Sequence, residues 1–116
     1  MANVLVLAED RCIGFTCAEV LTSSGFQARV GAWPAGAGAG VKPDVILAWD
    51  ATEAHADLIR AAHGAVPLLV CTWAHRQRWP GAEEVVRLPF NAERVAQRLA
   101  ETLRRANLSA HRPSAT

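Results

Sequence analysis

The chain has 116 residues, of which 51% are hydrophobic and 20% are charged, and its formal net charge is +1. This length and composition are typical of one globular domain with its own hydrophobic core. A nearly neutral chain has no overall field to attract nucleic acid or an anionic membrane, and no apolar run is long enough to span a bilayer. Direct nucleic-acid binding and membrane insertion are therefore not expected.

The charges and cysteines add two further expectations. Seven of the 11 acidic residues precede residue 76, whereas eight of the 12 basic residues follow residue 75. The last third of the chain is therefore basic. The three cysteines contain no CxxC pair, and an odd number of cysteines suits a reducing compartment, so a cytoplasmic location is predicted.

The first apolar run is followed at once by two acidic residues. Residues 4–8 are apolar and end at Glu9 and Asp10, which indicates a buried strand with two carboxylates at its carboxyl end. Apolar residues at helical spacing then predict a helix over residues 12–24. Apolar and polar residues alternate over residues 26–30, so we expect a short strand at an edge of the sheet.

A glycine-rich connector, residues 31–40, follows this strand. A helix is not favoured here, because each glycine costs about 1 kcal/mol in a helix relative to alanine. The pattern GxGxxG of a phosphate-binding loop fails, because Val41 stands at the third glycine position after Gly36 and Gly38, and a strand follows where a helix is required. We interpret the connector as a degenerate helix without a role in nucleotide binding.

The third apolar run is expected to be the central strand. Residues 45–49, which follow Pro43 and Asp44, carry apolar side chains on both faces, which is typical of a buried strand of a parallel sheet. In such sheets functional groups lie beyond the carboxyl ends of the strands. Trp49 and Asp50 therefore mark the place where a functional site is expected.

The next helix is predicted from Thr52, a good N-cap residue, to Ala62, with Leu58 and Ile59 on its buried face. His55 and His63 also lie on this helix. Because no cysteine or carboxylate completes a zinc set with them, we interpret both as solvated helix histidines.

The last part of the chain is predicted to hold two strands and a helix. The strands cover residues 66–72 and 84–88, and residues 73–80 between them leave room for only a shortened helix. A helix over residues 92–106 follows, and residues 107–116 are expected to be a polar tail or the start of a linker. The alternating order predicts one α/β domain, residues 1–106, with a doubly wound sheet of five parallel strands.

Five segments, in this order and at this spacing, resemble the CheY-like receiver domains of bacterial response regulators over residues 3–106. The segments are residues 4–10, 25–26, 43–47, 66–72 and 81–90. The resemblance implies the flavodoxin-like fold of CheY. It also implies a place in bacterial two-component signalling or transcription.

Receiver domains transfer a phosphoryl group to an aspartate at the end of the third strand. An acidic pair holds Mg²⁺, and a hydroxyl and a lysine contact the phosphoryl group, so that positive charge neutralises the charge that develops on it. By resemblance, the acidic pair here is Glu9 and Asp10, and the hydroxyl is Thr72. Trp49 occupies the phosphoacceptor position and Leu88 the lysine position. Two essential charges are therefore replaced by apolar side chains.

Asp50 and Arg87 adjoin the two replaced positions. A shift of one residue along a strand turns a side chain to the opposite face, so only a bulge or the freedom of a strand terminus would bring either into the pocket. Mg²⁺ is expected only if Glu9 and Asp10 still bind it, and no other metal or cofactor is expected. Without a third ligand, we favour these carboxylates as charges at a helix N-terminus.

The four tryptophans are Trp33, Trp49, Trp73 and Trp79, and three of them lie at or just after predicted strand ends. We favour the interpretation that indoles fill the space of the lost aspartate, Mg²⁺ and lysine. The alternative is an apolar pocket for a small ligand, or an aromatic contact surface for a partner. The residues that would form that surface are Trp73, His75, Arg76, Arg78, Trp79 and Arg87.

The sequence thus predicts an atypical, phosphorylation-independent receiver domain (a pseudo-receiver), which acts as a protein-interaction or regulatory module and not as an enzyme. Its expected partner is another protein or an output domain, and a homodimer is left open. Two alternatives stand beside this prediction. One is an active receiver phosphorylated on Asp50, and the other is a small-molecule sensor with a tryptophan-lined pocket.

Overall fold

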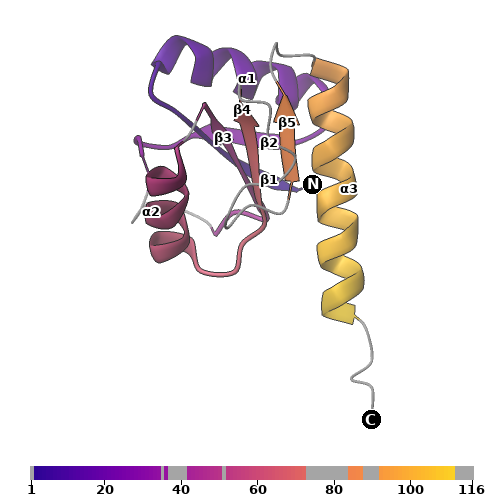
Figure 1. Ribbon diagram of the computed structural model, residues 1–116. Coiled ribbons are helices and arrows are strands. Elements are labelled where there is room, and N and C mark those ends of the chain that lie inside the picture. The colour runs from indigo at the N-terminus through magenta and orange to yellow at the C-terminus, as the bar shows by residue number, and fades with distance from the viewer. Residues whose placement is uncertain are drawn as a thin grey trace.

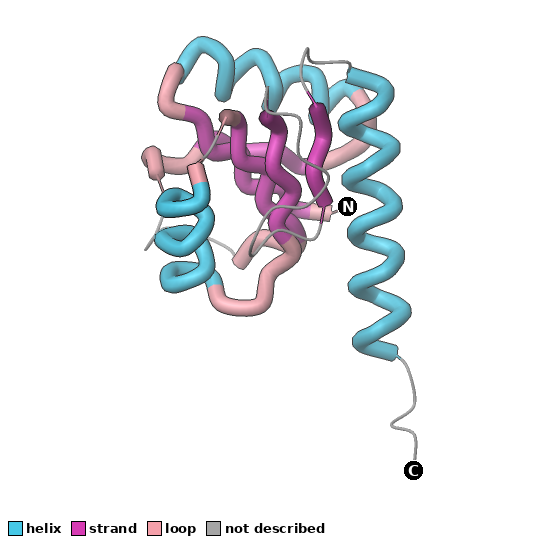
Figure 2. Tube along the Cα trace, in the orientation of Figure 1, coloured by secondary structure: helices cyan, strands magenta, loops and turns pink. Residues whose placement is uncertain are grey.

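The computed structural model describes residues 2–34, 36, 42–50, 52–72, 84–87 and 92–111. In this part of the chain five parallel strands form one sheet in the order β2-β1-β3-β4-β5 (Figures 1 and 2). The strands are β1 (Asn3–Ala8), β2 (Gln27–Val30), β3 (Val45–Trp49), β4 (Leu68–Thr72) and β5 (Glu84–Arg87). The helices are α1 (Arg11–Ser23), α2 (Glu53–His63) and α3 (Ala92–His111). The predicted doubly wound, five-stranded parallel sheet is confirmed.

Alternate residues of each central strand pack into two clusters on opposite faces of the sheet. In β1, Val4 and Val6 pack with residues of α1 and α3, whereas Leu5 and Leu7 pack with Ile59 and other residues of α2. Figure 2 accordingly shows α2 and α3 on opposite sides of the sheet. Because burying one such aliphatic side chain contributes about 1.5–3 kcal/mol, these two layers hold the strand ends in place.

Two glycines let the connector after β2 lie directly on β1. A Cβ atom at Gly31 would lie 2.8 Å from Cδ1 of Leu5, and one at Gly36 would lie 2.9 Å from Cδ2 of Leu7. Trp33, between the two glycines, is partly buried and packs against the cluster of Leu5, Leu7, Ile59 and their neighbours, called the α2-side cluster below; the cluster on the other face is called the α1-side cluster. This part of the connector therefore covers the sheet closely, which the glycine content alone did not predict.

The sequence predicted two irregular segments, a degenerate helix in residues 31–40 and a shortened helix in residues 73–80. Residues 31–34 and 36 are not helical, in agreement with the predicted degenerate helix, and the other residues of that connector lie outside the described part. The shortened helix predicted within residues 73–80 lies wholly outside it.

Helix α2 confirms the prediction of a helix after Thr52 but not its predicted buried face. Ile59 is buried, whereas Leu58 is 49% exposed. Neighbouring residues are turned by about 100° around a helix, so Leu58 cannot share the narrow stripe that Ile59 occupies. The C-terminus of α2 is held by the Arg60 guanidinium, which donates to the carbonyl oxygens of Gly64 (3.0 Å) and Val66 (2.6 Å).

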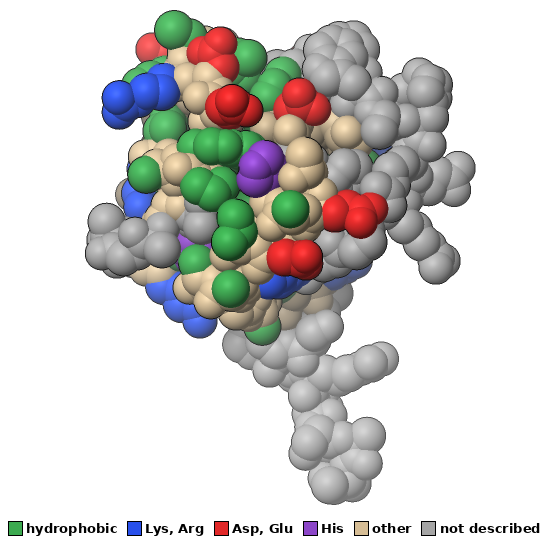
Figure 3. All heavy atoms as spheres, turned by 60° about the vertical axis from the view of Figure 1, so that its left-hand side comes forward, with side chains coloured by type: hydrophobic (Ala, Val, Ile, Leu, Met, Phe, Trp, Pro, Cys, Tyr) green, Lys and Arg blue, Asp and Glu red, His purple; other side chains and the backbone are tan. Residues whose placement is uncertain are grey.

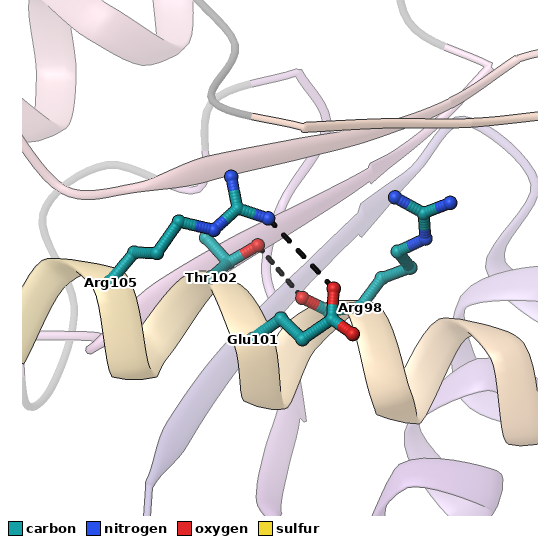
Figure 4. Close-up of polar contacts among 4 residues, drawn as sticks. All are labelled: Arg98, Glu101, Thr102 and Arg105. Carbon is teal, nitrogen blue, oxygen red and sulfur yellow. Dashed lines mark hydrogen bonds and ion pairs between the residues drawn. The ribbon is translucent and has the colours of Figure 1, made fainter.

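Helix α3 continues to His111, so the prediction of a polar tail from residue 107 is wrong for its first five residues. Polar composition alone does not stop a helix, and the first proline after it is Pro113. On α3, the buried Thr102 hydroxyl donates to the Arg98 carbonyl oxygen (2.8 Å), and Arg105 lies 3.9 Å from Glu101 (Figure 4). Among the described helices, none has both the length and the hydrophobicity that a membrane span requires.

Candidate functional site

The carboxyl ends of the three central strands lie side by side at one edge of the sheet. Ala8 of β1 is in register with Trp49 of β3, and Trp49 is in register with Cys71 of β4. The residues that follow these three are Glu9, Asp50 and Thr72. The structure therefore brings together the described members of the site predicted from the sequence.

Asp10 caps helix α1. Its Oδ1 atom accepts hydrogen bonds from the backbone N–H groups of Cys12 (2.8 Å) and Ile13 (3.4 Å). Such a carboxylate satisfies amide groups that have no partner within the helix, and it interacts favourably with the helix dipole. Asp10 and Glu9 are both exposed. For Asp10, this geometry is the one expected of a helix N-terminal charge.

The residues at this edge do not fit the Mg²⁺ site of receiver domains. Mg²⁺ requires oxygen ligands in nearly octahedral geometry. One oxygen of Asp10 is already shared by two amides, and Trp49 offers no oxygen where the phosphoacceptor carboxylate would stand. Within the described part of the chain, no three His, Cys, Asp or Glu side chains are grouped so that they could hold a metal ion.

Trp49 is the last residue of β3 and is partly buried. Its indole packs against the cluster that α1 and α3 share with the sheet, the cluster that also contains Leu47 and Cys71. The Trp49 side chain therefore contributes to the core on the α1 side of the sheet. A carboxylate here would have to leave apolar neighbours for water.

Asp50 leaves the extended conformation directly after the strand. Its φ angle is +52°, in the left-handed region, and its backbone N–H donates to the Cys71 carbonyl oxygen (2.7 Å). Strand alternation no longer fixes the direction of a side chain at such a residue. The freedom of the strand terminus that the Asp50 hypothesis required is therefore present, and Asp50 is exposed.

Thr72 is buried, with 3% of its surface exposed, and its position in β4 is in register with Arg87 of β5. The side chain of Arg87 is not described. The other residues proposed for the pocket and for the partner surface lie outside the described part of the chain. They are Trp73, His75, Arg76, Arg78, Trp79 and Leu88.

A ring contact that the sequence did not predict joins the connector after β2 to the start of α2. The ring centroids of Trp33 and His55 lie 4.6 Å apart, in an edge-on arrangement at 67°. His55 is partly buried and in contact with Trp33, so it is not simply a solvated helix histidine as predicted. Tertiary packing of Trp33 causes the difference, and sequence periodicity carries no information about it.

His55 also completes a capping box with Thr52. The Thr52 N–H donates to Nδ1 of His55 (3.1 Å), and the His55 N–H donates to Oγ1 of Thr52 (3.2 Å). Ser or Thr followed three residues later by Glu or Gln is the usual sequence of this motif. The spacing of Thr52 and His55 was therefore the sequence signal for this interaction, with histidine in place of the usual residue.

The two buried cysteines, Cys17 and Cys71, have raised thiol pKa values. Burial raises the pKa of the Cys17 thiol to about 11. Burial, and to a lesser extent the neighbouring Cys17, raises the pKa of the Cys71 thiol well above its usual range. A buried thiol with so little thiolate is a poor nucleophile, so neither Cys17 nor Cys71 is suited to nucleophilic chemistry.

Comparison with known proteins identifies the fold. No protein-family model and no curated protein sequence matches the chain. A CheY-like receiver domain protein from Methanospirillum hungatei matches in structure with a TM-score of 0.75 at 13% identity, over 94% of this chain and 98% of that one. The receiver domain of a signal transduction histidine kinase from Syntrophus aciditrophicus gives a TM-score of 0.72 at 13% identity, over 100% and 97%.

A third match is to part of a longer protein. NtrX from Brucella abortus aligns with a TM-score of 0.72 at 18% identity, over 94% of this chain but only 28% of that chain. The chain thus has the fold of CheY-like response regulator receiver domains, as its resemblance to them implied. At these identities the likeness establishes the fold, and the chemistry has to be argued from the residues of this chain.

Proposed function

We propose that this chain is a phosphorylation-independent receiver domain, a regulatory module of bacterial signalling that works in the cytoplasm through contacts with another protein and not as an enzyme. The observation that carries the proposal is Trp49 at the end of β3. Its indole packs in the α1-side cluster, at the position where phosphoryl transfer would require a carboxylate nucleophile.

The rest of the pocket supports the same conclusion. Phosphoryl transfer depends on positive charge placed against the transferred group. Asp10 uses Oδ1 to cap α1, and Leu88 stands where receiver domains have lysine. Leucine in place of lysine weakens the electrostatic stabilisation of the transition state, and the capping role of Asp10 occupies an oxygen that would bind Mg²⁺. We therefore assign the fold a binding role.

The partner that we propose is an output domain or a separate signalling protein. In NtrX the matched region is a minor part of a longer chain, which is an example of a receiver fold joined to further sequence. Helix α3 extends past the end of the sheet in Figure 1, so part of it does not pack on the sheet and can contact such a partner. Its exposed residues include Arg94, Arg104 and Arg105, which favour an acidic partner surface.

Phosphorylation of Asp50 is the second candidate, and one observation favours it. The left-handed φ angle of Asp50 frees its side chain from the alternation of β3, and the side chain is exposed to solvent. The third hypothesis, a pocket lined by tryptophans, gains no such support. Trp33 and Trp49 pack against clusters on opposite faces of the sheet.

Intact mass after incubation with Mg²⁺ and a small acyl phosphate separates the first two candidates. The proposal predicts an unchanged mass. A single phosphoryl adduct that is absent from Asp50→Ala would overturn it and make Asp50 the switch. An adduct that persists in Asp50→Ala would show modification elsewhere and would exclude the Asp50 hypothesis.

A further inference from the structure

The capping box at the start of α2 depends on the protonation state of His55. A neutral imidazole has one N–H donor and one acceptor nitrogen. Because the Thr52 N–H donates to Nδ1 of His55, the lone pair is at Nδ1 and the proton is on Nε2. Glutamine or glutamate at the same position would accept this hydrogen bond without such a restriction near neutral pH.

Protonation of His55 sets two donors against each other. The imidazolium has an N–H on Nδ1, which then faces the Thr52 N–H at 3.1 Å. Of its two neighbours on Thr52, the protonated Nδ1 can donate only to Oγ1, which lies 3.1 Å away, and it can no longer accept from the backbone N–H. The Thr52 N–H would lose its acceptor, and a positive charge would stand in the first turn of a helix, where the dipole disfavours it.

The ring of His55 connects this cap to the connector after β2, on the same face of the sheet. Its edge-on contact with Trp33 reaches the connector after β2, and Trp33 packs against the α2-side cluster. Thr52 lies two residues after Asp50, whose backbone is held in the left-handed region. A movement of the His55 ring therefore changes both the Trp33 contact and the segment that carries Asp50.

Several charged groups surround this arrangement. Asp50 precedes the helix, Glu53 and Asp57 lie on α2 itself, and Arg29 lies on β2 in register with Leu5, whose side chain faces α2. Figure 3 shows the α2 side of the molecule, where acidic and apolar side chains surround a histidine. The structural effect of protonation follows from the hydrogen bonds between Thr52 and His55.

We propose that Thr52, His55 and Trp33 form a pH-sensitive latch, which is closed when His55 is neutral and opens when His55 is protonated. Histidine changes its charge between about pH 5 and pH 8, a range that a cell can reach. Opening releases the Thr52 N–H from its acceptor, and the charge on the ring changes its edge-on contact with Trp33. The latch acts in the absence of phosphorylation, so it stands or falls independently of the function proposed above.

Nuclear magnetic resonance of the whole chain from pH 8 to pH 5 tests the latch. At pH 8 we expect the His55 ring with its proton on Nε2. As the pH falls, the Thr52 amide and the Trp33 indole N–H resonances should shift with the same midpoint as the His55 ring. Amide exchange of Thr52, corrected for its intrinsic pH dependence, should rise about tenfold, the ratio that corresponds to the loss of one net hydrogen bond.

Two variants separate the latch from general effects of pH. His55→Gln keeps a side-chain acceptor for Thr52 but cannot titrate, so the shifts of Thr52 and Trp33 should disappear while the fold is retained. His63→Asn, at the other end of α2, should leave both shifts in place. The proposal is overturned if neutral His55 has its proton on Nδ1, or if Thr52 and Trp33 titrate equally in His55→Gln.

Discussion

At the scale of single residues, the two residues at the end of β3 differ in where their side chains lie and in their backbone conformation. Trp49 ends β3 with its side chain in the core, and Asp50 then turns into the left-handed region, held by a hydrogen bond from its N–H to the Cys71 carbonyl oxygen. Asparagine and aspartate adopt this conformation more readily than other residues that have a Cβ atom. Asp50 therefore has a structural role that does not depend on phosphorylation.

This role predicts different effects for two substitutions of Asp50. Asp50→Gly should be more stable than Asp50→Ala by about 1 kcal/mol, because a left-handed backbone crowds a Cβ atom against the carbonyl group. Urea unfolding of the two variants measures the difference. At Asp57, an exposed position within α2, the order should be reversed, because glycine is the poorer helix residue there. Equal stability of the two Asp50 variants would contradict the left-handed backbone.

At the scale of elements, the glycine-rich connector takes the place of a helix over part of the sheet. Gly31 and Gly36 allow its backbone to approach Leu5 and Leu7 more closely than a Cβ atom would permit. A helix would cover the same face with side chains. The connector covers it with backbone and with the Trp33 indole, and so it places Trp33 beside His55.

Gly36→Ala is therefore expected to be costly. The added methyl group would lie 2.9 Å from Leu7 Cδ2, at a residue with a φ angle of +58°. Overpacking and left-handed strain together predict a loss of about 2–4 kcal/mol in the free energy of unfolding. Gly25→Ala is the control, since its φ angle is also positive (+98°) and nothing lies within 4 Å of the added Cβ, so it should lose only about 1–2 kcal/mol from backbone strain. Chemical denaturation gives both values, and equal losses would contradict the close contact with β1.

The elements also show what the sequence could and could not predict. The buried strands were predictable because apolar runs such as residues 4–8 and 66–72 fit few other structures. The end of α3 was misplaced, because polar residues do not terminate a helix. The contact of Trp33 with His55 and the left-handed Asp50 depend on packing between segments distant in sequence, and local patterns do not encode such packing.

At the scale of the whole molecule, the sheet divides the core into two layers with different functions in the proposed scheme. The α2-side layer contains Trp33 and the latch, and the α1-side layer contains Trp49 together with the buried cysteines. Trp49 at the end of β3 thus extends the α1-side core to the edge of the sheet. The stability of this layer should consequently respond to groups that become charged, and its cysteines are such groups.

The raised pKa values of these thiols predict that the protein loses stability in alkaline solution. An unfolded thiol ionises near pH 9, whereas the Cys17 thiol keeps its proton up to about pH 11. Above pH 9 the folded state therefore binds more protons than the unfolded state, and the free energy of unfolding falls as the pH rises through this window. For Cys17 the total loss by pH 11 is of the order of 2–3 kcal/mol, and Cys71 contributes with the same sign.

Urea unfolding between pH 8 and pH 10.5, under reducing conditions, measures this loss. Cys17→Ala removes one titrating group, so its stability should be lower at pH 8 because of the cavity but should fall less steeply above pH 9. Cys12→Ser is the control, since Cys12 is exposed and its replacement should leave the slope unchanged. If Cys17→Ala falls as steeply as the unmodified chain, ionisation of Cys17 does not contribute to the alkaline loss, which would contradict the raised pKa of its thiol. If the slope is reduced as expected, Cys17 ionises only against the desolvation that its burial in the α1-side layer imposes, and the packing of α1 on the sheet excludes water from that thiol.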